Sequence, residues 1–170
     1  MLTDWSDFFT TTGAAGGTLV GLLFVVVSLG TGLSTSRKLD IAHASLTPAL
    51  YSFVGVLLQS MVVLVPWQSN CPSGVIFVVM GIGGLIYRIN AVLVRSSLHL
   101  IAIQSKTDRI FHNVTPIVAS VSLICGGAGL ISEEAFAPFA IACSTTLLLV
   151  SGIYRTWGET LALIKLSDKS

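Results

Sequence analysis

The stretch GAAGGTLVGLLFVVVSLGTGL, residues 13–33, decides the fold class of this chain. It holds no charged residue, and an α-helix of about 20 apolar residues crosses the ~30 Å hydrocarbon core of a bilayer. Strands of a membrane barrel would alternate between polar and apolar residues, and this stretch does not. It is longer than the ~7–15-residue apolar core of a secretory signal peptide, and acidic rather than basic residues, Asp4 and Asp7, precede it. The stretch therefore predicts a membrane-spanning helix.

The rest of the chain repeats this pattern. Of its 170 residues, 53% are hydrophobic and only 10% are charged, whereas about 25% of the residues in soluble domains are charged. Pro48 and Pro116 fall at the starts of two later apolar blocks, and we expect them in the first turns of their helices. The sequence predicts a single all-α membrane domain, an integral bundle of five transmembrane helices. The predicted spans are residues 13–33, 46–67, 74–98, 115–131 and 135–154.

The charges between the apolar blocks indicate an orientation. Lysine and arginine occur in residues 34–45, in residues 101–114 and after Tyr154, but not in residues 68–73 or 132–136. Loops rich in lysine and arginine stay on the cytoplasmic side of a membrane. We therefore expect a multi-pass protein of the cell inner (plasma) membrane, with the N-terminus outside and the C-terminus inside.

Both ends of the chain have amphipathic patterns. Trp5, Phe8 and Phe9 share one face of a short helix, and aromatic side chains favour the headgroup level of a membrane. Residues 155–170 predict an amphipathic cytoplasmic tail along the membrane surface. A frayed terminus is the alternative for the tail.

Small residues predict two helix contacts. Gly13, Gly17 and Gly21 recur every four residues on one face of the first span, and Ser122 and Gly126 form a similar face on the fourth. Small side chains let helix backbones approach closely in lipid. The partner of the first face is either another helix of the same chain or the same helix of a second copy.

A basic stripe marks the third span. Arg88, Arg95 and His99 lie within about 20° of one another around a helix, and Lys106 returns to the same angle if the helix continues that far. Three surroundings are compatible with Arg88: anionic lipid headgroups, a water-filled cavity or subunit axis that attracts anions, or a buried polar contact to another helix. No other predicted span carries an Asp or Glu at mid-membrane as its partner. Asn90, on the opposite face, is expected to bond a neighbouring helix.

Glu133 and Glu134 follow the fourth span. We expect them in the first turn of the fifth helix, where carboxylates complement the helix dipole, or as an outer mouth that attracts cations. Cys71, in the same outer region by the predicted orientation, either cross-links two subunits or stays a free thiol.

Enzymatic chemistry has no support in this sequence. His43, His99 and His112 are scattered, and no metal-ligand, phosphate-loop or nucleophile motif occurs. We therefore expect neither an enzyme nor a cofactor or metal. A net charge of +1 does not suggest a nucleic-acid partner.

The N-terminal residues resemble a family of small prokaryotic multi-pass membrane proteins. Their N-termini read Trp-x-x-Phe-Phe, a Gly/Ala-rich turn, then Leu-x-Gly-Leu-x-Phe-Val-x-Val-Ser-Leu, which matches Trp5, Phe8, Phe9 and residues 13–29 here. Some members are labelled as modulators of the FtsH membrane protease. The resemblance covers about the first thirty residues and implies no active-site residues.

These observations favour a small homo-oligomeric channel or pore-like protein with a basic cytoplasmic vestibule that passes small anions. The stripe without a carboxylate partner motivates this hypothesis. A non-conducting scaffold or regulator of another membrane protein or protease is the alternative. The lipid bilayer, and its anionic lipids at the basic end, are the expected surroundings in either case.

Overall fold

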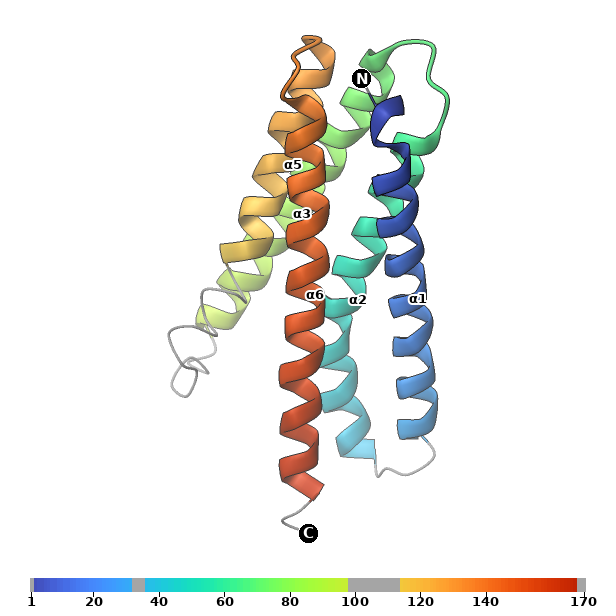
Figure 1. The fold of residues 1–170 in the computed structure, drawn as a ribbon. Helices are drawn as coiled ribbons and strands as arrows, with labels where there is room; N and C mark the ends of the chain where they lie inside the picture. Colours follow the sequence, from blue (N-terminus) through green and yellow to red (C-terminus); the bar gives the residue numbers. More distant parts are fainter. Residues whose placement is uncertain (1, 32–35, 98–113, 168–170) are drawn as a thin grey trace.

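The structure, a computed structural model, describes residues 2–31, 36–97 and 114–167, and the side chains of residues 2–26, 28, 47–90 and 114–157. Every element within these residues is a helix (Figure 1). A single 3-10 turn, η1 (Thr3–Trp5), leads into the first of five α-helices. The α-helices are α1 (Ser6–Thr31), α2 (Ser36–Leu64), α3 (Asn70–Ser97), α5 (Thr115–Ile131) and α6 (Ala137–Ser167).

Four helical segments of the described chain are long and apolar enough to cross a membrane. They are Thr3–Val26, Thr47–Leu64, Asn70–Asn90 and Ala137–Trp157. Helix α5 is apolar but has 17 residues. At 1.5 Å per residue it is about 25 Å long, the lower limit for a span. The described part of the chain is all-helical, and the chain has the composition of a membrane protein.

The helices pack in the order α1, α2, α6, α5, α3 (Figure 1). The N-terminus, the α2–α3 connection and the α5–α6 turn lie at one end of the bundle, here called the N-terminal end. Toward the opposite end, α3 and α5 lean away from α2 and α6 as a pair (Figure 1). Helices α2 and α3, although consecutive in the described chain, therefore barely touch.

Two helices extend beyond the apolar blocks from which they were predicted. Helix α2 begins at Ser36, so Pro48 lies well inside it and not in its first turn. Helix α6 continues without a break to Ser167, so most of the predicted tail, residues 155–170, is a continuation of α6. Apolar blocks mark the length suited to lipid, whereas polar residues continue a helix wherever no proline or turn stops it.

The turn between α5 and α6 corrects a second expectation. Glu133 and Glu134 lie in this turn, before α6 begins at Ala137. The Glu133 amide donates to the carbonyl of Leu130 (3.3 Å) and the Glu134 amide to that of Gly129 (2.8 Å). Glu133 adopts φ = 58°, so the turn is a Schellman motif with glutamate at the left-handed position that glycine usually takes. The backbone amides of the two glutamates cap the end of α5, and neither residue begins α6.

The N-terminal aromatic residues contribute to the core. Phe9 is fully buried, in one cluster with Phe77 of α3. Trp5 packs edge-on against Phe139 of α6, with ring centroids 4.7 Å apart. Phe9 and Trp5 therefore contact other helices of the bundle, because η1 leads directly into α1.

Candidate functional site

Glycine brings α3 and α5 into backbone contact. A Cβ at Gly127 would lie 2.7 Å from the Gly74 carbonyl oxygen and 2.9 Å from the Val78 nitrogen. A Cβ at Gly81 would lie 2.6 Å from Ile124 Cγ1. Real side chains do not fit at such distances, so only glycine allows this approach.

The predicted small-residue face of α5 packs against α6. A Cβ at Gly126 would lie 2.7 Å from Ile141 Cγ1. The Ser122 hydroxyl donates to the carbonyl of Ala140 at 2.8 Å. Helix α5 therefore presents one glycine face to α3 and another to α6, and this sandwich fixes the α3–α5 pair against the bundle.

The predicted glycine face of α1 is only partly used within the chain. A Cβ at Gly13 would lie 2.8 Å from Ser60 Cβ of α2, whereas Gly17 makes an ordinary contact and Gly21 has nothing within 4 Å. Gly16, which the sequence analysis did not select, approaches the α2 backbone to 3.2 Å. The close partner of Gly13 is thus another helix of the same chain.

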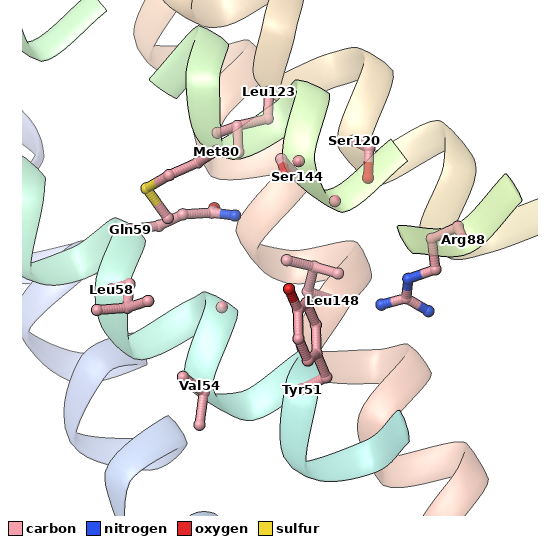
Figure 2. A pocket seen from close by; sticks show the side chains of 13 residues that line it. Tyr51, Val54, Leu58, Gln59, Met80, Arg88, Ser120, Leu123, Ser144 and Leu148 are labelled. Atoms are coloured by element: carbon pink, nitrogen blue, oxygen red, sulfur yellow. The ribbon is translucent and has the colours of Figure 1, made fainter. Parts of the chain in front are cut away.

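A cavity of about 420 Å³ lies between α2, α3, α5 and α6 (Figure 2). It fits the ~300–1,000 Å³ of typical ligand pockets. Glycines provide part of the space, and a Cβ at Gly83 would meet nothing within 4 Å. Most of the lining side chains are aliphatic or thioether: Val54, Leu58, Met80, Leu123 and Leu148.

Arg88 lines this cavity, and it is the charged residue of the lining. Its side chain is only 8% exposed. One guanidinium nitrogen, Nη2, donates to the Ser52 hydroxyl over a long 3.5 Å, and that hydroxyl in turn donates to the Pro48 carbonyl at 3.1 Å. Because the single hydrogen of Ser52 goes to Pro48, its lone pairs are free to accept from Arg88.

Arg88 has no carboxylate partner among the described side chains. The acidic residues with described side chains are Asp4, Asp7, Glu133 and Glu134. They lie at the start of the chain and in the α5–α6 turn, at the N-terminal end of the bundle, whereas Arg88 lies in the second half of α3, which begins at that end. A buried charge is costly unless it is paired and hydrogen-bonded. A guanidinium carries five N–H donors, and the bond to Ser52 uses one of them. The arrangement suits an anion that enters the cavity.

Polar side chains also face the cavity from α2 and α6. Figure 2 shows the amide of Gln59 and the hydroxyl of Tyr51 directed into the space. The Gln59 carbonyl oxygen accepts a bond from Thr145 at 2.8 Å. Ser144 is fully buried, and its hydroxyl has no hydrogen-bond partner among the described residues. That hydroxyl is an unpaired polar group in a mainly apolar wall.

Stacked tyrosines join α2 to α3 beside the cavity. The rings of Tyr51 and Tyr87 lie 4.5 Å apart and are 9° from parallel. The next residue on each helix makes the Ser52–Arg88 bond. These two adjacent contacts tie α2 to α3 where the helix backbones themselves are apart.

The sequence analysis missed most of this site. It did not assign Tyr51, Ser52, Gln59 or Ser144 to a site. Asn90, which it expected to bond a neighbouring helix, is exposed. Arg155, counted there with the cytoplasmic charges, is buried in α6 at 6% exposure. The sequence offered one signal for this burial. Arg155 follows the buried Ser151 by four residues on α6, and residues at i and i+4 share a helix face.

The remaining predicted site residues either lie away from the cavity or fall outside the residues that the structure describes. Arg95 lies in α3 with its side chain outside the described residues, and His99 and Lys106 lie outside them altogether. Glu133 and Glu134 are exposed at the N-terminal end, and so is the thiol of Cys71. Among the described residues, no three His, Cys, Asp or Glu side chains gather as metal ligands.

Comparisons of the chain with protein-family models, curated proteins and solved structures found no match. The site must therefore be interpreted from its own chemistry. Its elements are a buried arginine, a mainly apolar cavity, and the stacked tyrosines at its side.

Proposed function

We propose that this protein is a small channel-like protein that passes small anions through the cavity at Arg88. The observation that carries the proposal is the buried guanidinium, which faces a cavity of about 420 Å³ without a described carboxylate partner. In a low-dielectric interior a fixed charge attracts its counter-ion far more strongly than in water. A route for an anion requires such a site, and also a way out on each side.

The membrane arrangement belongs to the proposal. Helix α5 is the fifth span beside the four longer ones, and the N-terminal end faces the exterior of a prokaryotic inner membrane, because the lysines and arginines gather in the other loops. The cavity then lies where the α3–α5 pair diverges toward the cytoplasm. The sequence after Arg88 stays basic, with Arg95, His99 and Lys106, and this is the composition that attracts anionic lipids on the cytoplasmic side.

We propose a homo-oligomer in which each chain carries its own cavity. Arg88 points into the cavity of its own chain (Figure 2), so a shared central pore is not needed for its role. The mass of the purified protein in detergent tests the oligomer. A monomer would remove that part of the proposal and leave the cavity route intact.

Anion flux into proteoliposomes tests the route. Arg88→Met keeps the side chain's length without its charge, and we expect at least a tenfold loss of chloride or nitrate uptake. Gly83→Leu should also lower uptake, because its side chain enters open space in the cavity. Gly21→Leu is the matched control, since its Cβ also meets nothing but lies on α1, away from the cavity. Wild-type vesicles without flux, or Arg88→Met vesicles with normal flux, would refute the route.

A regulator of another membrane protein or protease is the second candidate. The exposed apolar side chains of α1 favour it, Phe24 at 61% and Leu22 at 56% among them, since such a surface can receive a foreign helix. The resemblance of the N-terminal residues to labelled protease modulators points the same way. A stoichiometric membrane partner that is lost on Phe24→Ala, together with normal anion flux in that variant, would assign α1 this second role.

A further inference from the structure

We infer that the anion bound at Arg88 is amphipathic: a single-chain monocarboxylate whose charged end meets the guanidinium and whose hydrocarbon body fills the cavity. This inference rests on the proposed function and names the class of anion. Five features of the cavity carry it: the chemistry of its wall, the number of its charges, its size, the spare N–H donors of the guanidinium and the unpartnered hydroxyl of Ser144.

The wall favours a hydrocarbon body. Val54, Leu58, Met80, Leu123 and Leu148 surround the space (Figure 2), and Gly83 leaves part of it open. A bare inorganic ion gives up hydration here for one cation and buries no apolar surface, so among the small anions that could enter it binds more weakly than one with a hydrocarbon body. A hydrocarbon chain gains free energy from every methylene that it moves from water to this wall.

The number of charges favours a monoanion. Arg88 is the charged residue that lines the cavity. A phosphate monoester is close to a dianion at neutral pH, and one arginine leaves its second charge unbalanced. A carboxylate carries one charge, and its two oxygens match the parallel N–H groups of a guanidinium.

The size of the space favours one chain. At about 420 Å³ the cavity is near the lower limit of drug-sized pockets. A two-chain lipid does not fit inside it, whereas a short- or medium-chain acid does. The ligand is therefore an organic acid and not a bilayer phospholipid.

The guanidinium and Ser144 both have capacity left for a guest. The bond from Arg88 to Ser52 is long, at 3.5 Å, so little is lost when a carboxylate competes for that nitrogen. The fully buried Ser144 hydroxyl lines the same cavity without a described partner. An arginine with N–H donors to spare and one unpartnered hydroxyl, in a largely apolar space, favour a cavity that is completed by a ligand.

Equilibrium dialysis of the full-length protein in detergent tests the inference, with radiolabelled octanoate as the probe and protein-free micelles subtracted. Butyrate, hexanoate, octanoate and decanoate serve as unlabelled competitors. We expect affinity to rise about fourfold per methylene, the burial free energy of one CH₂, until the cavity is full. Octanol and octyltrimethylammonium, which share the chain but lack the negative charge, should compete at least tenfold more weakly.

Variants connect the binding to the cavity. Arg88→Met should weaken octanoate binding at least tenfold, and Gly83→Leu should shift the optimum to shorter chains because it fills part of the space. Gly21→Leu should match the wild type. Octanol that competes as well as octanoate would overturn the inference, since binding would then be simple partitioning.

Inorganic anions separate this inference from the proposed function. Chloride or nitrate that displaces octanoate at equal concentration, without chain-length dependence among the acids, would overturn the amphipathic ligand and leave the anion route standing. Absence of any anion binding to the wild type would overturn both.

Discussion

Two glycines on α3, separated by a single residue, have opposite surroundings. A Cβ at Gly81 would lie 2.6 Å from Ile124 of α5, whereas a Cβ at Gly83 would meet nothing within 4 Å. They are about 200° apart around the helix. One side of α3 is closed against α5 by backbone contact, and the other opens on the cavity toward α2. Glycine therefore serves close packing on one side and empty volume on the other.

The difference shows what each side of α3 depends on. In lipid, helices associate through packing and hydrogen bonds and not through exclusion of water. On the closed side, Gly74 and Gly127 supply that packing. On the open side, the contacts of Tyr51 with Tyr87 and of Ser52 with Arg88 span the gap. Mutations on the closed side should affect stability, and mutations on the open side should affect the site.

Gly127→Ala should have the largest effect on stability. The new methyl group would meet backbone atoms of Gly74 and Val78 at 2.7 Å and 2.9 Å, and a backbone cannot turn aside as a side chain can. Overpacking of this kind costs about 1–3 kcal/mol. Unfolding in mixed micelles with increasing SDS measures the loss.

Gly83→Ala is the control for this prediction. Its methyl group enters open space, so the free energy of unfolding should change by less than ~0.5 kcal/mol. Equal losses in the two variants would show that the closed and open sides of α3 do not differ in packing.

Tyr87→Ala should have a smaller effect, on the open side. The stack with Tyr51 is one of the two contacts that join α2 to α3 beside the cavity. An aromatic pair contributes about 0.5–1.5 kcal/mol beyond the area that it buries, and Tyr87 is 36% exposed. We expect a loss of about 1 kcal/mol. Ile86→Ala, at the neighbouring position and 55% exposed, is the control and should lower the free energy of unfolding clearly less. A loss as large as that of Tyr87→Ala would show that the tyrosine stack does not stabilise the contact between α2 and α3.

The closed side was partly predictable from the sequence, and the open side was not. Apolar length predicts helices, and the spacing of Ser122 and Gly126 predicted a face that does pack against another helix. The same spacing predicted equal roles for Gly13 and Gly21, yet Gly21 meets nothing. Spacing defines a face of one helix, whereas contact depends on where the neighbouring helix lies.

The cavity could not be predicted from the sequence for a similar reason. It exists because the α3–α5 pair diverges from α2 and α6 (Figure 1), and no local pattern encodes that divergence. Arg88 stood out because a charge within an apolar block is costly. Gln59 and Ser144 did not, since single polar residues in membrane helices most often bond a neighbouring helix.

Glu133→Gly should have the smallest effect, and a favourable one, at the turn that ends α5. A non-glycine residue in the left-handed region costs about 1–2 kcal/mol, and φ = 58° places Glu133 there. Glycine removes that strain but loses about 0.5–1 kcal/mol through the greater freedom of its unfolded chain. The net gain should be about 0.5 kcal/mol in the same unfolding assay.

Two neighbouring variants separate backbone strain from charge in this gain. Glu133→Gln removes the carboxylate and keeps the strained backbone, so it should not stabilise the protein. Glu134→Gly changes the one neighbouring glutamate, whose φ is not positive, and should bring a loss through entropy alone. If all three variants stabilise the protein equally, repulsion between the two carboxylates dominates. The gain from Glu133→Gly would then not come from relief of backbone strain in the Schellman turn.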